Sequence, residues 1–108
     1  MSSIRPRVRI PQTASPDEVI RIRTLMTHPM ETGNRPGPDG AMLPRNVIER
    51  FTCHFEDELV FELEVAGGMA ANPFIEFQAR VPHSGSFRFV WTEDTGETWV
   101  ETARVEVA

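Results

Sequence analysis

The chain has 108 residues, of which 40% are hydrophobic and 25% charged, and its net charge at pH 7 is −5. This length and balance predict one globular domain, residues 1–108, with enough apolar side chains to form a core. The acidic balance argues against nucleic-acid binding. A single cysteine, Cys53, excludes an internal disulfide and a multi-thiolate zinc site.

The first ten residues, MSSIRPRVRI, contain no apolar stretch of signal-peptide length. No segment approaches the roughly 18 apolar residues of a membrane-spanning helix. From these features alone we expect a cytoplasmic protein, or one that is exported by means of another protein.

Apolar residues recur at every second position along most of the chain, which predicts strands and no convincing helix. The predicted strands, in chain order, are 5–10, 19–27, 47–56, 59–65, 74–81, 87–92 and 97–107. The segments QTASPD, EDE and PHSG are predicted turns, AGGMAANP is a longer connection, and EDTG is a hairpin signal. The strand 59–65 has the clearest alternation, with an expected dry face of Leu59, Phe61, Leu63 and Val65.

About seven short strands separated by turns are typical of an immunoglobulin-like β-sandwich. The Cys…Trp…Cys arrangement of antibody domains is absent, so the predicted fold is closer to the fibronectin type III form. The fold class is therefore all-β.

The segment THPMETGNRPGPDGAMLPRN, residues 27–46, joins two predicted strands and contains no strand-like alternation. Connections in compact domains are usually about 4–6 residues long, and loops beyond about 12–15 are uncommon unless they bind something or are disordered. Three explanations are therefore open: the segment is a flexible insertion, the flanking strands are wrongly assigned, or the loop is a functional segment.

Two groups of residues have side chains that could carry chemistry. Cys53 and His54 are adjacent, but the strand period places them on opposite faces, so we expect Cys53 to be a buried apolar residue rather than a nucleophile. Met26, His28 and Met30 offer soft ligands that suit copper, although one histidine and two methionines are few ligands for a site. The alternative function is therefore a stand-alone periplasmic binding module, such as a copper carrier that uses these three residues. No spacing indicates a catalytic triad, so we do not expect an enzyme.

The acidic run EDELVFELE is most simply a solvated hairpin, with docking of a basic partner as the alternative. Its strand, 59–65, contains neither proline nor lysine, which commonly blunt exposed sheet edges. If this strand is an edge, we expect it to pair with a partner chain around Val60.

Several motifs occur together in one order: RPRVRIP, HPMETG, LPRNVIERFTC, ANPF and the ending FVWTEDTGETWVETARVEVA. In this combination the chain resembles the SoxZ family of bacterial thiosulfate oxidation, from about Arg5 to the C-terminus. The sequence departs from the usual family pattern in carrying arginine or neutral residues where lysines are common.

The resemblance implies a non-catalytic β-sandwich subunit without a cofactor, held in a heterodimer with a SoxY-like carrier. That partner bears sulfur intermediates on a cysteine in a glycine-rich arm, so Cys53 is not expected to be the carrier thiol. The resemblance also implies a periplasmic location, reached by export with the partner. It implies transient docking to a haem-containing thiosulfate-loading enzyme, a sulfate-releasing hydrolase and a sulfane dehydrogenase, with no nucleic-acid or membrane partner.

With this resemblance, the long loop is expected to be a contact segment, since binding groups collect on loops anchored to rigid scaffolds. The candidate partner-interface residues are His28, Met30, Glu31, Arg45, Asn72 and Phe74, with Val60 on the predicted edge strand. For Asn72 and Phe74 the alternative is structural, namely a turn at Asn72-Pro73 and a core position for Phe74.

Overall fold

The computed structural model describes residues 6–34, 36–65 and 72–108. Every regular element in these ranges is a strand, and they contain no helix that could span a membrane. The strands are β1 (Pro6–Arg9), β2 (Thr13–Ala14), β3 (Glu18–Met26), β4 (Ile48–Phe55), β5 (Glu58–Glu64), β6 (Phe74–Val81), β7 (Gly85–Glu93) and β8 (Thr98–Val107). Arg5, predicted to begin the first strand, and most of the connection AGGMAANP lie outside the described residues.

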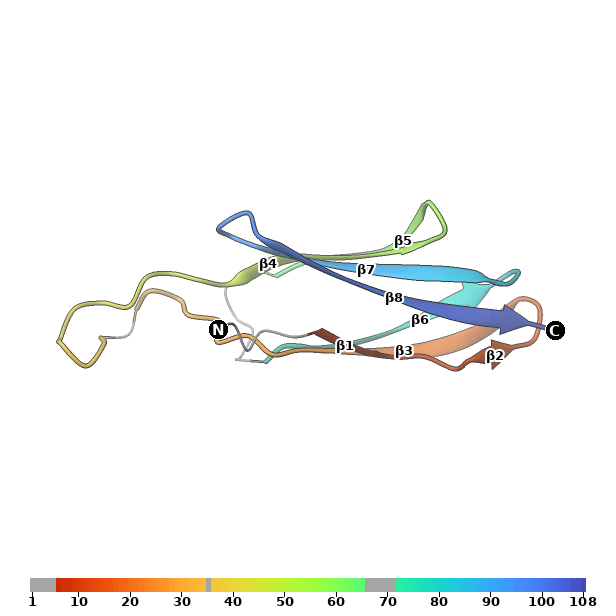
Figure 1. Cartoon of the computed structure of the whole chain (residues 1–108), viewed down its shortest axis with the longest axis horizontal. Coiled ribbons are helices and arrows are strands. Elements are labelled where there is room, and N and C mark those ends of the chain that lie inside the picture. The colour runs from red at the N-terminus through yellow and green to blue at the C-terminus, as the bar shows by residue number, and fades with distance from the viewer. Residues whose placement is uncertain (1–5, 35, 66–71) are drawn as a thin grey trace.

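The strands form two sheets that face each other across the core (Figure 1). One sheet has the order β1-β3-β6 and the other the order β2-β8-β7-β4-β5. The seven predicted strands correspond to β1 and to β3 through β8, which confirms the all-β, immunoglobulin-like sandwich.

The prediction that QTASPD is only a turn was wrong, because Thr13 and Ala14 form β2 and pair in parallel with the end of β8. The backbone N–H of Glu106 donates to the carbonyl of Gln12 (2.9 Å), and that of Ala108 donates to Ala14 (3.2 Å). The N-terminal segment therefore contributes β1 to one sheet and β2 to the other. A two-residue strand is too short to show alternation, so the sequence carried no signal for it.

The core is aromatic and lies between the sheets. Trp91, Phe51, Phe87 and Phe89 are fully buried on β7 and β4. The ring of Phe51 lies 6.0 Å from that of Phe77 on the facing sheet, edge-to-face. Burying each such side chain contributes about 1.5–3 kcal/mol, so this cluster joins the two layers.

β5 is an edge strand of the larger sheet, which is the condition on which its expected pairing with a partner chain depends. The register against β4 shifts by one residue between Cys53 and His54, which leaves Val60 without a partner in the ladder. The expected dry face is consequently incomplete, because Leu59 is 49% exposed whereas Val65 is buried. The regular part of the edge is Phe61–Glu64.

Candidate functional site

The long loop between β3 and β4 is an ordered, narrow projection, which we call the finger (residues 30–46). Glu31 and Asn46 pair through both backbone hydrogen bonds, at 2.7 and 2.6 Å. Nearer the tip, Pro36 forms a bridge with Met42 and the N–H of Gly37 donates to the carbonyl of Ala41 (2.6 Å). The finger extends beyond the ends of the two sheets (Figure 1). The strand assignments on either side of the loop are therefore correct, and the loop has its own hydrogen-bonded ladder.

His28 lies at the base of the finger and is 1% exposed. Its Nδ1 accepts a hydrogen bond from the backbone N–H of Met30 (2.9 Å), so the ring proton sits on Nε2. Nε2 then donates to a carboxylate oxygen of Glu93 at 2.7 Å. A hydrogen bond to a carboxylate is stronger than a hydrogen bond between two neutral groups. This bond therefore fixes the orientation of the His28 ring.

Glu93 connects the finger to the turn between β7 and β8. It is 4% exposed and accepts hydrogen bonds from His28 and from the Thr95 hydroxyl. With its amide nitrogen turned toward this carboxylate, Asn46 donates to it as well, at 2.5 and 3.2 Å. The charge is thus buried with several donors, as a buried carboxylate requires.

Met30 and Asn72, which both form hydrogen bonds with His28, have an uncommon backbone conformation. Both have positive φ, 51° and 55° respectively, which is rare for a residue such as Met and better tolerated by Asn. The Met30 sulfur accepts the N–H of Ile48 (3.3 Å). Asn72 accepts the N–H of His28 with its side chain (2.9 Å) and donates its own N–H to the His28 carbonyl (2.7 Å).

The structure thus brings together three of the predicted interface residues, His28, Met30 and Asn72, but their side chains differ in exposure. The side chains of His28 and Met30 were expected on a contact surface and are instead buried, where they position the finger from beneath. Asn72 is exposed but is occupied with the backbone of His28. Sequence reasoning missed Glu93, which is 65 residues from His28 in the chain and reaches it only through the fold.

The remaining candidates lie on the surface. Arg45 forms an ion pair with Asp94 (3.0 Å), and Asp94 also exchanges backbone and side-chain bonds with Val47, so this turn supports the finger. Glu31 is half-buried. Phe74 is 57% exposed on β6, which rules out the alternative core position, and Val60 is 40% exposed on β5.

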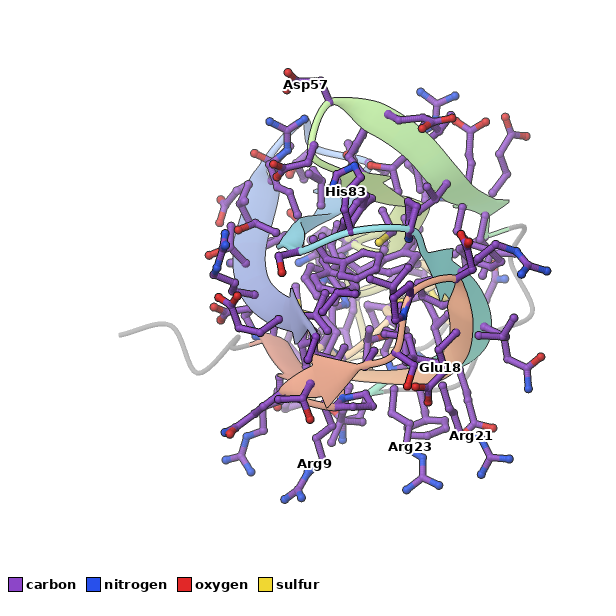
Figure 2. All side chains as sticks on the ribbon, turned by 90° about the vertical axis from the view of Figure 1, so that its right-hand side faces the viewer. Arg9, Glu18, Arg21, Arg23, Asp57 and His83 are labelled. Carbon is purple, nitrogen blue, oxygen red and sulfur yellow. The ribbon has the colours of Figure 1, made fainter. Side chains whose placement is uncertain are left out.

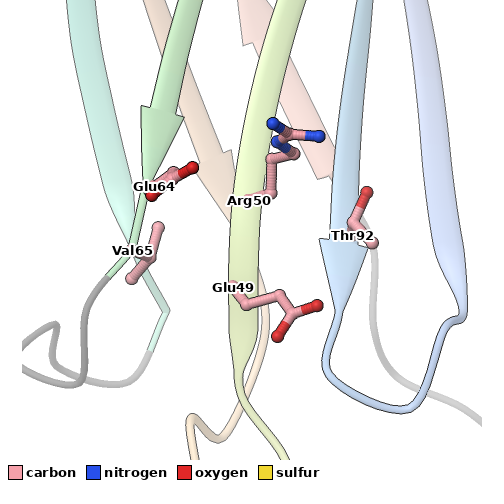
Figure 3. Close-up of a pocket in the computed structure, with 5 residues that line it drawn as sticks. All are labelled: Glu49, Arg50, Glu64, Val65 and Thr92. Atoms are coloured by element: carbon pink, nitrogen blue, oxygen red, sulfur yellow. The ribbon is translucent and has the colours of Figure 1, made fainter.

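A shallow pocket opens on the outer side of the larger sheet, between β5, β4 and β7. Figure 3 shows Glu49 and Arg50 on β4, with Glu64 and Val65 on one side and Thr92 on the other. The register between β4 and β7 shifts between Ile48 and Arg50, so Glu49 and Arg50 are both exposed. Arg50 is paired with Glu62 at 2.7 Å. The residues that line the pocket include exposed charges and no nucleophile paired with a base.

Cys53 is confirmed as a core residue. It is completely buried on β4, and burial raises the pKa of its thiol from 9.0 to about 12. The side chain of His54 lies on the opposite face of the strand and is half-buried. The thiol is therefore protonated at neutral pH and has no base beside it among the described residues, which excludes the nucleophilic role.

Residues 8–104 match the family described as Sulphur oxidation protein SoxZ. This chain belongs to the SoxZ family. The match covers nearly the whole sandwich and confirms the resemblance seen in the sequence motifs. The SoxZ-family chain is thus a subunit of a Sox sulfur-oxidation complex.

Solved structures with the same fold include a superoxide reductase and a sulfur carrier protein. The superoxide reductase (neelaredoxin) of Ignicoccus hospitalis is 16% identical, with 95% of this chain and 80% of that chain covered and a TM-score of 0.74. The sulfur carrier protein SoxY of Chlorobium limicola f. thiosulfatophilum is 11% identical, with 95% and 78% covered and a TM-score of 0.67. At such low identity these likenesses show the fold alone. No curated protein sequence matches the chain.

The copper alternative through Met26, His28 and Met30 receives no support from the geometry of this SoxZ-family chain. Both ring nitrogens of His28 are engaged, by Met30 and by Glu93, and the sulfur of Met30 accepts a backbone N–H. Within the described ranges, no cluster of three or more His, Cys, Asp or Glu side chains could hold a metal ion. A copper ion at His28 would have to displace one of these bonds.

Proposed function

We propose that this SoxZ-family chain is the non-catalytic subunit of a heterodimeric sulfur carrier, paired with a SoxY-like partner. The family match carries the proposal, and the state of Cys53 supports it. A covalent sulfur carrier needs an accessible thiolate, whereas the single thiol of this chain is buried with a pKa of about 12. Sulfur intermediates must then be carried on a cysteine of the partner.

The complex acts in the periplasm in this proposal, and the chain is exported together with its partner. There it docks in turn to a haem-containing enzyme that loads thiosulfate, a hydrolase that releases sulfate and a sulfane dehydrogenase. The finger suits contact with more than one protein, because it projects from the sandwich while its base is fixed by His28, Met30 and Glu93.

Native mass spectrometry of the chain, isolated from the periplasm of its host grown on thiosulfate, tests the proposal. We expect a one-to-one complex with a second protein that carries sulfur adducts, and no adduct on this chain. Recovery of the chain alone, or sulfur adducts on Cys53, would contradict the carrier role.

The β5 edge is the second proposed contact with the partner. An edge strand presents unpaired N–H and C=O groups to a neighbouring chain, and here exposed Val60 precedes the regular segment Phe61–Glu64. Val60→Pro should weaken heterodimer formation at least about tenfold, as expected when a central interface contact is lost. The isolated chain should stay folded, because proline is tolerated at an edge or a bulge.

Val60→Thr is the matched control, since it keeps the backbone N–H and a β-branched side chain. The measurement is the dissociation constant of the heterodimer by isothermal titration, with circular dichroism of each variant. Equal affinity for the proline and threonine variants would remove β5 from the interface and leave the finger as the contact.

A further inference from the structure

The outer face of the β1-β3-β6 sheet is cationic, although the whole chain carries a net charge of −5. We call it the arginine face. Its exposed cationic residues, alternating with the buried side chains of the same strands, are Arg7, Arg9, Arg21, Arg23 and Arg80. Figure 2 shows Arg9, Arg21 and Arg23 pointing away from the sandwich into solvent.

Few acidic groups in the described part of the chain offset this charge. Glu76 shares the face, and it pairs with Arg23 at 3.0 Å. Arg80 donates to the backbone carbonyl of Asp17, a neutral acceptor that leaves the charge of the guanidinium unbalanced. The carboxylate of Glu18, at the start of β3, accepts the N–H of Ser15.

The register of the sheet places two arginines opposite one another, which lowers the stability of the isolated chain. Arg9 and Arg23 are direct partners across β1 and β3, and like charges placed opposite one another destabilise a sheet. The ion pair with Glu76 offsets part of this repulsion at Arg23, and packing adds little because both side chains are exposed. An anionic ligand that bridges the two guanidinium groups would reverse the sign of this interaction.

The spacing of the arginines fits an extended peptide. Arg21 and Arg23 are two residues apart on β3, a separation of about 6.7 Å that equals the distance between alternate side chains of another strand. Guanidinium groups bind carboxylates through two parallel hydrogen bonds. One shallow depression is lined by Arg9, Arg21 and Arg23 together.

Two exposed apolar side chains lie at one end of the arginine face. Leu25 and Phe74 are cross-strand partners on β3 and β6, and they are 37% and 57% exposed. A second depression runs from Arg9 and Arg23 to this pair. Exposed aromatic residues beside arginines are typical of protein interfaces, whereas a small inorganic anion would make no use of the apolar end.

We propose that the arginine face is a docking surface for an acidic, extended segment of a protein partner, with alternate carboxylates followed by an apolar residue. It lies on the sheet that does not contain β5, so it is free for transient docking while the edge or the finger holds the carrier subunit. Only the identity of the partner, a Sox enzyme, rests on the proposed function. The binding chemistry follows from the face itself.

The test is a titration of the ¹⁵N-labelled full chain with a synthetic peptide of about ten residues, the upper length of an ordinary strand. In this peptide glutamate alternates with serine, and leucine and phenylalanine follow at one end. We expect shift changes confined to β1, β3 and β6, including Leu25 and Phe74. Binding should be lost at about 1 M salt, where the screening length is about 3 Å, and in a peptide with glutamine in place of glutamate.

The triple variant Arg9→Gln, Arg21→Gln, Arg23→Gln should bind the acidic peptide at least about tenfold more weakly, since several charge pairs are lost at once. The matched control, Arg50→Gln, Arg88→Gln, Arg104→Gln, makes the same change in net charge on the exposed side of the other sheet and should bind normally. Equal weakening by both variants, or no binding by the unmodified chain, would overturn the proposal.

Two further measurements separate other occupants. Binding of phosphatidylglycerol vesicles through the same arginines, without a preference for the glutamate peptide, would assign the face to a lipid surface and overturn the proposal.

Where the heterodimer is obtained, the peptide should bind it as well as the single chain. Loss of peptide binding in the heterodimer would show that the carrier subunit buries the face, which would overturn its role in transient docking. If no heterodimer forms, the proposed function fails while the titration of the single chain still decides this inference.

Discussion

His28 determines how the finger leaves the sandwich, because one ring holds two parts of the chain that are far apart in sequence. Its Nδ1 accepts the N–H of Met30 and its Nε2 donates to Glu93. Removing the ring would leave a buried N–H and a buried carboxylate each short of a partner. We therefore expect His28→Ala to lower the free energy of unfolding by about 2–4 kcal/mol, measured by urea denaturation.

His83→Ala is the control for that substitution. His83 is exposed in the turn before β7, and its Nδ1 contacts the backbone carbonyl of the neighbouring Ser84. This variant should lose less than about 1 kcal/mol. Similar losses in the two variants would mean that the buried network contributes little.

Cys53 predicts how stability changes at alkaline pH. The unfolded chain loses the thiol proton near its ordinary pKa of 9.0, whereas the folded chain keeps it until the pKa of about 12. The stability linked to Cys53 is therefore complete below pH 9 and declines by about 1.4 kcal/mol per pH unit above it. Urea denaturation between these pH values should show a shallower decline for Cys53→Ala than for the unmodified chain. Parallel declines would contradict the buried, protonated thiol.

At the scale of the strands, prediction from sequence succeeded where one face is buried. Along β3, the residues Ile20, Ile22, Thr24 and Met26 are all buried, as the alternation indicated. The two-residue period failed to predict burial where the hydrogen-bonded ladder between β4 and β5 is irregular. Leu59 continues the pattern of β5 but is exposed, because the register shifts at Val60.

The start of β7 contains a tight contact between strands that the sequence did not reveal. A Cβ on Gly85 would lie 2.7 Å from the Cζ of Phe55, a ring that is itself buried. Well-packed cores do not absorb such an overlap without displacement. Gly85→Ala should therefore destabilise the fold by about 1–3 kcal/mol, measured by thermal unfolding. Ser86→Ala, next in the strand and half-buried, should have an effect within about 0.5 kcal/mol.

At the scale of the whole molecule, the sequence indicated the projecting loop but not how its base is built. The unusual length and composition of residues 27–46 identified the finger, and the motif HPMETG marked its base. Burial of His28 could not be predicted, because its partner Glu93 belongs to a turn 65 residues away. The arginine face likewise emerges only when the register places Arg9 of β1 beside Arg23 of β3.

The separation of finger and sandwich leads to a final prediction. Residues 32–42 are exposed or half-buried where the structure describes them, whereas the anchoring side chains Met30 and Val47 lie outside this stretch. Replacing 32–42 by a short Gly-Ser turn should change the melting temperature by less than about 4–8 °C, the shift that 1 kcal/mol produces in a domain of this size. The same change should weaken binding of the carrier subunit, or turnover by the docked enzymes, at least about tenfold.

Met30→Ala should have the opposite profile, because it keeps the tip of the finger and removes a buried side chain together with the sulfur that accepts the Ile48 N–H. Its cost to the free energy of unfolding should be about 2–5 kcal/mol, and where the chain remains folded the partner should still bind. A shortened finger that leaves both heterodimer affinity and turnover unchanged would show that the projection is not a contact segment. A large fall in melting temperature on shortening would instead show that the finger stabilises the sandwich, and that the two are one cooperative unit.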